Sequence, residues 1–244
     1  MSRFFMAGAN MAGGVAVITG ADAEHIRVLR LRLGEKVVVC DGSGTDHHCH
    51  ISRLGADFAE VTLEESVPSP AEASVRVTVL CGIPKGDKAE TIIQKCTENG
   101  AAEIVFFPCE RCVSRPDERS MAKKLVRWQK IAEEAAKQSG RGIIPQVRAV
   151  ADFAGALNEA KQCDLGLFLY ETGEREGLRG VLQSAGEIRS CALITGPEGG
   201  FEKYEADLAK AAGLRVCAMG PRILRCETAP VVALSAVMYE TGNL

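Results

Sequence analysis

The chain has 244 residues, with 29 Lys and Arg against 32 Asp and Glu, and a formal net charge of −3. At ~150 residues per domain, this length predicts one large domain or two smaller ones. Charged residues at 25% and hydrophobic residues at 46% exclude a disordered or fibrous chain. The near-neutral total gives no whole-chain electrostatic reason to bind nucleic acid, although a total can hide an uneven distribution.

The sequence shows no signal for a membrane or for export. No stretch approaches the ~18 apolar residues of a membrane span, and glycines near the N-terminus interrupt the apolar core that a secretory signal needs. The ten cysteines are scattered, several of them within apolar runs. We therefore expect reduced thiols, no membrane partner and a cytoplasmic protein.

Two motifs contain metal-ligand residue types. Cys109-Glu-Arg-Cys112 is a lone CxxC, whereas a zinc site needs a second pair of ligands. His47-His-Cys-His50 holds three of the four histidines, but it follows a Gly-rich turn signal. Structural or incidental roles are favoured for both motifs, and no metal site is predicted.

Residues 1–67 show short apolar or alternating runs, at 15–18, 36–40 and 59–63, punctuated by Gly, Asp and Ser. This pattern predicts a small β-rich domain, with one short helix at 25–30. Pro68 and Pro70 follow this region, and two prolines so close together favour an extended linker over 68–73.

From residue 74 to 244, strand patterns alternate with helix patterns. The predicted strands are 75–80, 103–107, 164–169, 191–194 and 214–218. The predicted helices cover about 87–99, 120–139, 202–212 and 228–240. Strands separated by helices indicate parallel βαβ units and hence an α/β domain.

Open parallel sheets bind ligands at the carboxyl ends of their strands, so the loops there are candidate sites. The loop after the fourth strand reads Thr195-Gly-Pro-Glu-Gly-Gly200, and the loop after the fifth spans 219–229. Neither contains a P-loop or the spacing of a dinucleotide-binding fingerprint. Tight turns explain the Gly and Pro, but they do not explain the density of Arg and Glu beside them.

Motifs along most of the chain, taken in this order, resemble the RsmE family of 16S rRNA uridine-N3 methyltransferases, within the knotted SPOUT class. They are His25-Ile-Arg-Val-Leu-Arg30, Lys85-Gly-Asp-Lys88, Glu110-Arg-Cys112, the tract from Trp128 to Arg141, Gly196-Pro-Glu-Gly-Gly200, and Gly220-Pro-Arg-Ile-Leu-Arg225 with Glu227-Thr-Ala229. Two positions depart from the family pattern. Asn99 stands where Leu is usual, and Cys226 stands where Thr is usual.

The resemblance implies a PUA-like β-barrel for RNA at the N-terminus and a SPOUT domain with a deep trefoil knot at the C-terminus. It also implies S-adenosylmethionine as methyl donor and a homodimer. The residues that it implies around the cofactor are Leu169, Tyr170, Glu171, Gly196, Glu198, Gly199, Gly200, Met219, Gly220, Ile223, Leu224, Arg225 and Thr228.

The chemistry of uridine N3 suggests which side chains could act. Its weakly acidic proton must leave before nitrogen attacks the methyl group. We hypothesise that Arg225 or Arg222 stabilises the resulting anion and that Glu171, Glu198 or Glu227 is the base. For Glu198, bracing of the loop is favoured over catalysis.

Charge and apolarity also point to partners. Residues 111–148 hold ten Lys and Arg against four Asp and Glu, a local charge of +6, which is consistent with a localised phosphate-binding face. The run 231–238 is apolar nearly all round, so that helix is covered on more than one side, which favours a homodimer. The candidate RNA-binding residues are Arg3, Arg27, Arg30, Lys85, Lys88, Arg111, Arg115, Lys123, Arg127 and Arg141.

The predicted function is methylation of a uridine N3 in 16S rRNA, within the small ribosomal subunit. Two alternatives stay open: a SPOUT ribose-2′-O methyltransferase acting on tRNA or rRNA, and a non-catalytic RNA-binding assembly factor.

Overall fold

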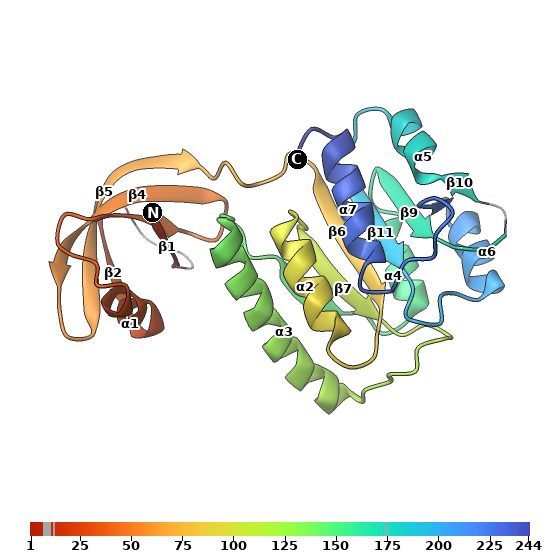
Figure 1. Cartoon of the computed structure of the whole chain (residues 1–244), viewed down its shortest axis with the longest axis horizontal. Coiled ribbons are helices and arrows are strands. Elements are labelled where there is room, and N and C mark those ends of the chain that lie inside the picture. Colours follow the sequence, from red (N-terminus) through yellow and green to blue (C-terminus); the bar gives the residue numbers. More distant parts are fainter. Residues whose placement is uncertain (7–10, 12, 174) are drawn as a thin grey trace. The chain divides into compact units, whose positions relative to one another are not determined.

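The computed structural model describes residues 1–6, 11, 13–173 and 175–244. The chain divides into two compact units, each built around one sheet (Figure 1). The first unit comprises Met1–Glu72 and Ala136–Ile144, and the second comprises Ala73–Ala135 and Pro145–Leu244. In the described part of the chain, no helix has the length and apolarity to cross a membrane.

The first unit is a five-stranded sheet with one helix. Its elements are β1 (Ser2–Phe5), β2 (Val15–Thr19), α1 (Gly20–Val28), β3 (Lys36–Cys40), β4 (Thr45–Leu54) and β5 (Phe58–Pro68). The order is β1-β3-β4-β5-β2, with β1 parallel to β3 and the other neighbours antiparallel. β2 alternates exposed Val15 and Val17 with buried Ala16 and Ile18, so only one of its faces joins the core.

A buried ion pair ties residues 136–144 to this unit. Arg141 Nη2 lies 2.7 Å from Glu72 Oε2, and the amides of Gly142 and Ile143 donate to Glu72 Oε1. Arg3 Nη1 donates to the Arg141 carbonyl. The sequence pattern places 136–144 in the second domain and Glu72 in a linker. The structure differs because this long-range pairing leaves no signal in local periodicity.

The second unit is built on a seven-stranded sheet in which every pairing is parallel. Its strands are β6 (Arg76–Gly82), β7 (Glu103–Phe107), β8 (Gln146–Ala149), β9 (Leu165–Leu169), β10 (Glu176–Gly177), β11 (Ser190–Thr195) and β12 (Arg215–Ala218). Their order is β10-β12-β9-β11-β6-β7-β8. This sheet confirms the α/β fold, and the trefoil knot stays a prediction.

Helices cover both faces of this sheet (Figure 1). They are α2 (Lys88–Glu98), α3 (Glu118–Ser139), α4 (Phe153–Ala160), α5 (Leu178–Ala185), α6 (Lys203–Ala211) and α7 (Ala229–Glu240). Phe106 packs on Trp128 of α3, with ring centroids 4.5 Å apart, and Phe107 packs on Phe153 of α4. Since neighbouring side chains on a strand point to opposite faces, α3 and α4 lie on opposite sides of the sheet.

The apolar helix α7 is covered within the chain by α2, α5, β6 and β11. Ala233, Leu234 and Val237 are fully buried there. Asn99, at the end of α2, donates from Nδ2 to Ser235 Oγ at 2.6 Å and to the Val231 carbonyl at 3.3 Å. The polar residue at this position therefore has a structural role, because it joins α2 to α7.

Candidate active site

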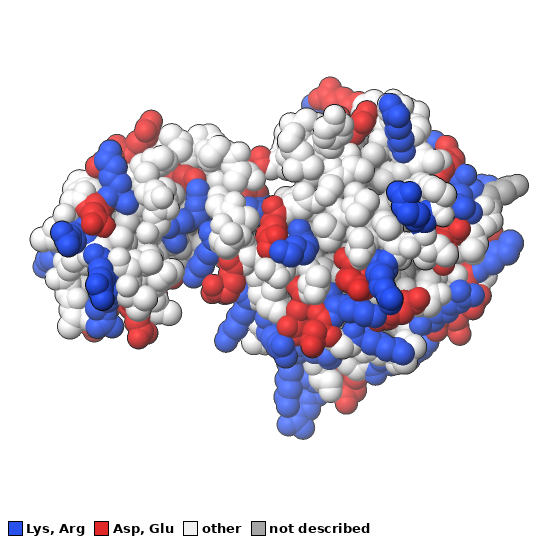
Figure 2. Space-filling model, viewed as in Figure 1, with Lys and Arg blue, Asp and Glu red and all other residues white. Residues whose placement is uncertain are grey.

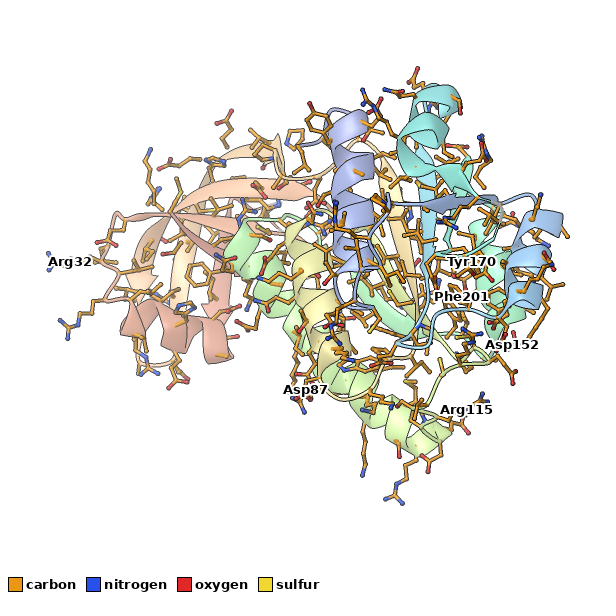
Figure 3. The ribbon with its side chains drawn as sticks, turned by 45° about the vertical axis from the view of Figure 1, so that its right-hand side comes forward. Arg32, Asp87, Arg115, Asp152, Tyr170 and Phe201 are labelled. Carbon is orange, nitrogen blue, oxygen red and sulfur yellow. The ribbon has the colours of Figure 1, made fainter. Side chains whose placement is uncertain are left out.

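The loops that follow β9, β11 and β12 meet at one cavity of about 330 Å³. These strands are neighbours in the sheet, and the cavity lies at their carboxyl ends, where open parallel sheets bind ligands. Tyr170, which is labelled in Figure 3, lines this cavity. The charged residues of the lining are Lys88, Glu171, Arg175, Glu198, Arg222, Arg225 and Glu227.

The loop 196–200 requires its glycines. Gly200 has φ of +66°, and a Cβ atom there would lie 2.3 Å from Glu171 Oε1. A Cβ atom on Gly196 would lie 3.1 Å from the backbone of Gly200. The next residue, Phe201, is buried against Phe168 with ring centroids 4.4 Å apart. The loop is therefore tight, anchored at its end, and able to bring bare backbone to a ligand.

Glu198 is held by hydrogen bonds rather than free for chemistry. Its Oε1 accepts from the backbone amide of Lys85 at 3.0 Å and from Lys88 Nζ at 2.6 Å. Partial burial opposes ionisation of this carboxyl group, but the hydrogen bonds outweigh it and hold the pKa of Glu198 below its usual value. The geometry favours the bracing role, in which Glu198 connects the start of α2 to the cavity loop.

The other two carboxylates of the lining differ in their partners. Glu227 Oε2 accepts from Cys226 Sγ at 3.2 Å, and a bond from its own backbone amide is the main cause that lowers the pKa of Glu227. Glu171 accepts no hydrogen bond from any described residue. Oε1 of Glu171 lies against Gly200. Because neither oxygen accepts a hydrogen bond from a described residue, both can take a proton, or accept a hydrogen bond, from a ligand.

The loop 196–200 is also held by hydrogen bonds from the segment that follows β7. Arg111 donates from Nη1 to the Gly199 carbonyl at 2.9 Å and from Nε to Glu202 Oε1 at 2.8 Å. The Glu110 amide donates to Glu205 Oε1, and Glu202 with Glu205 forms the capping box of α6. Residues 110 and 111 thus fix both ends of the turn that leads into α6.

Comparisons with known proteins agree with this geometry. A model described as an RNA methyltransferase domain matches residues 71–238, and an RNA methyltransferase PUA domain matches 18–64. Ribosomal RNA small subunit methyltransferase E of Bacillus subtilis is 35% identical, over 93% of this chain and 91% of that protein. Its counterpart in Mycobacterium tuberculosis is 34% identical, over 95% and 88%. The chain belongs to this family.

A solved structure of the family adds the cofactor. Ribosomal RNA small subunit methyltransferase E of Neisseria gonorrhoeae, crystallised with S-adenosylmethionine, superposes with a TM-score of 0.82 at 30% identity. The match covers 98% of this chain and 97% of that one.

Most residues expected around the cofactor do line the cavity, and so do all the catalytic candidates. The exceptions are Gly199 and Thr228. Gly199 faces Arg111, and Thr228 is the N-cap residue of α7. Sequence reasoning missed Arg175 in this lining, although it follows β9 in the same loop as Glu171 and could have been included on that basis.

Two of the expected RNA-binding residues are paired with carboxylates of the first unit. Arg3 pairs with Asp46 at 2.7 Å, where its side chain is 15% exposed. Arg141 is buried against Glu72 with 4% of its side chain exposed. These pairs give both arginines a structural role in the first unit, and their contact with RNA stays a prediction.

Other members of that set have partners at the surface. Lys88 and Arg111 hold the cavity loop, as described above. Arg127 pairs with Glu90 at 2.8 Å, and Arg115 donates to the carbonyls of Cys109, Glu110 and Cys112. The members that are exposed and whose side chains form neither an ion pair nor a hydrogen bond with a described residue are Arg27, Arg30, Lys85 and Lys123.

The histidine tract lies in β4 and its side chains bond within the sheet. His47 Nδ1 lies 2.8 Å from Ser66 Oγ, and His50 Nδ1 lies 3.0 Å from Glu64 Oε1. Within the residues that the structure describes, no three His, Cys, Asp or Glu side chains form a group that could hold a metal ion.

Proposed function

We propose that this protein transfers a methyl group from S-adenosylmethionine to N3 of one uridine in the 16S rRNA of the small ribosomal subunit. The observation that carries the proposal is the cavity at the ends of β9, β11 and β12, where Glu171, Arg222 and Arg225 converge. Family membership supports the substrate class. Such a reaction would take place in the cytoplasm, where ribosomal subunits assemble.

The lining fits S-adenosylmethionine chemically. Apolar side chains of Leu169, Met219 and Leu224 offer contacts for a flat base, and the tight loop around Gly196 exposes backbone groups. Acidic side chains in the lining complement the positive sulfonium and amino groups of this molecule. When bound, it supplies the activated methyl group.

The chain's own residues then have to prepare the uridine. A guanidinium beside O2 or O4 stabilises the anion that forms when N3 loses its proton, and Arg225 and Arg222 both line the cavity. Glu171 is the carboxylate best suited to accept that proton, because Glu198 and Glu227 already accept hydrogen bonds from protein groups. The enzyme otherwise aligns the nitrogen with the methyl carbon.

A transfer assay tests this function directly. Small subunits from cells that lack the endogenous modification are incubated with the protein and S-adenosylmethionine carrying a labelled methyl group. We expect label in 16S rRNA, and no label in subunits that already carry the modification. Failure to label the unmodified subunits, while calorimetry shows cofactor binding, would favour the non-catalytic assembly factor.

We also propose a homodimer formed through α7 and the neighbouring loop after β12. Val232 and Tyr239 on α7 are 41% and 74% exposed, and Ile223 beside the cavity is 81% exposed. Large apolar side chains that are exposed on one helix and on the loop leading into it are typical of an interface. Light scattering at micromolar concentration should give twice the mass of the chain, and a monomer would contradict the proposal.

The proposed RNA-binding face includes the outward side of α3. Figure 2 shows Lys and Arg side chains gathered over this helix. Arg119, Lys123 and Lys130 recur at spacings of four and seven residues, so they share one helix face. All three are exposed and form no ion pair with a described residue.

A further inference from the structure

The CxxC motif lies directly behind the cavity loop, and the site described above makes no use of its thiols. Cys109 Sγ and Cys112 Sγ are 3.4 Å apart. The Cys112 amide donates to the Cys109 carbonyl in a turn, and Arg115 holds this turn by donating to both carbonyls. The two thiols are thus presented to each other by a closed backbone turn.

Cys109 also lies beside Gly82, which packs against the cavity loop. A Cβ atom on Gly82 would meet both Cys109 Sγ, at 3.2 Å, and Pro197, at 2.6 Å, so the three residues pack together. Between the cysteines, Arg111 donates to the Gly199 carbonyl and the Glu110 amide donates to Glu205. A change in the turn is therefore transmitted to the loop by direct contacts.

We propose that Cys109 and Cys112 are a site of reversible disulfide formation by a peroxide, and that closing this bond weakens S-adenosylmethionine binding at the adjacent loop. The second part rests on the proposed function. In the first step a Cys112 thiolate attacks hydrogen peroxide, giving the sulfenic acid and releasing hydroxide, which takes up a proton. The Cys109 sulfur then attacks the Cys112 sulfur, and the second oxygen leaves as water. Overall, two thiols and one peroxide give one disulfide and two waters.

The environment of Cys112 is distinct from that of the other thiols. Its hydrogen bond with Cys109, followed by backbone amides and the charge of Arg115, lowers the pKa of Cys112 below that of an ordinary thiol. Burial raises the pKa of each thiol outside the pair. Oxidation by limited peroxide should therefore select this pair.

The geometric change is small but acts at a tight turn. A disulfide holds its sulfurs about 2.05 Å apart, so the two atoms must approach each other from 3.4 Å. Arg111 and Glu110 move with the turn, and with them the carbonyl of Gly199 and the start of α6. Displacements near 1 Å in a positioned site can reduce activity by up to about a hundredfold.

The test uses the full-length reduced chain, treated with limiting hydrogen peroxide and then blocked with N-ethylmaleimide. Trypsin cleaves after Arg111, which separates the two cysteines into peptides 96–111 and 112–119. We expect these two peptides to be joined through Cys109 in the oxidised sample, with N-ethylmaleimide on Cys96, and to be separate after dithiothreitol. A sample in which other cysteines oxidise first, and this pair stays reduced, overturns the assignment.

Calorimetry with S-adenosylmethionine tests the coupling on the same samples. We expect the oxidised chain to bind about tenfold more weakly, with recovery after dithiothreitol. The Cys109→Ser variant should show no such response, whereas Cys163→Ser, which removes a half-buried thiol elsewhere, should respond as the wild type does. Unchanged affinity in the cross-linked chain overturns the coupling. A reduced chain that binds no S-adenosylmethionine refutes the proposed function and the coupling together, while the disulfide assignment is decided by the peptides.

Discussion

Glu171 and Arg225 come from different loops yet line the same cavity, and we assign them complementary parts of one proton transfer. Glu171→Gln keeps the size of the side chain and removes its basicity. We expect turnover to fall by about 10²–10⁴-fold while S-adenosylmethionine binding is nearly unchanged. Glu187→Gln, on an exposed loop outside the cavity, is the matched control. Wild-type turnover in Glu171→Gln would eliminate the proposed base.

Arg225→Ala separates charge stabilisation from cofactor binding. Loss of a cation beside the uridine anion should reduce turnover by about 10²–10³-fold. Radiolabel transfer and calorimetry, measured on the same preparation, distinguish the two roles. A variant that loses cofactor affinity in proportion to turnover would place Arg225 in binding alone.

Glu198 should act on binding and not on the chemical step, because it braces the loop through Lys85 and Lys88. Glu198→Gln is expected to weaken cofactor binding severalfold with little change in turnover at saturation. The lowered pKa of Glu198 sets the sign of the pH effect: the brace is complete above the usual glutamate range and is lost as pH falls through the folded-state value. Calorimetry over falling pH should show this loss in wild type only, and an identical profile in the variant would contradict it.

The sequence predicted which residues line the cavity better than it predicted which charged residues are paired within the chain. The two glycine-containing loops led to most of the cavity lining, because the carboxyl ends of neighbouring parallel strands must meet. Counting cations could not show that Arg3 is paired with Asp46, or Arg141 with Glu72, since the partners lie far away in the sequence. A contact of these two arginines with RNA therefore stays a prediction.

Among the secondary-structure elements, the junction of α2 and α7 carries a polar link in an otherwise apolar contact. Asn99 Nδ2 donates to Ser235 Oγ at 2.6 Å. We expect Asn99→Ala and Ser235→Ala each to lower the free energy of unfolding by about 1 kcal/mol, with a positive coupling between them in a double-mutant cycle. Gln94→Ala, on the exposed side of α2, should change it little. Strict additivity in urea unfolding would show that the bond contributes nothing.

The elements that periodicity predicted are those with long or fully buried patterns. β7 reproduces the expected strand at 103–107, and α3 and α7 begin within two residues of their expected starts. α4, α5, β1, β8 and β10 were not predicted, because short elements offer too few residues to establish a period. The longer strand β4 was also missed, because its His and Cys residues do not form an apolar or alternating run. β10 has only two residues, and its pairing with β12 depends on a tertiary contact.

Over the whole molecule, a net charge of −3 combines paired and unpaired groups. Within the basic segment 111–148, ion pairs neutralise several cations, among them Arg127, Arg141 and Arg148. The exposed residues Arg119, Lys123 and Lys130 on α3 form no ion pair with a described residue. The RNA-binding face that we propose is therefore narrower than the local charge of the sequence suggests.

Charge reversal tests this face. Arg119→Glu, Lys123→Glu and Lys130→Glu together should weaken RNA binding and lower the slope of log affinity against log salt by about 0.7–0.9 for each phosphate that the protein no longer neutralises. S-adenosylmethionine binding should be preserved. Lys161→Glu, an exposed position at the end of α4, is the control for net charge. A salt slope equal to that of the wild type would leave α3 as a solvated helix.

Position-resolved mapping of methylated 16S rRNA identifies the atom that receives the methyl group. We expect a single modified uridine, methylated at N3, in small subunits incubated with the protein and S-adenosylmethionine. The same treatment with Glu171→Gln should leave that uridine unmodified. A methyl group on a ribose 2′-oxygen, or on a base other than uridine, would contradict methylation at uridine N3.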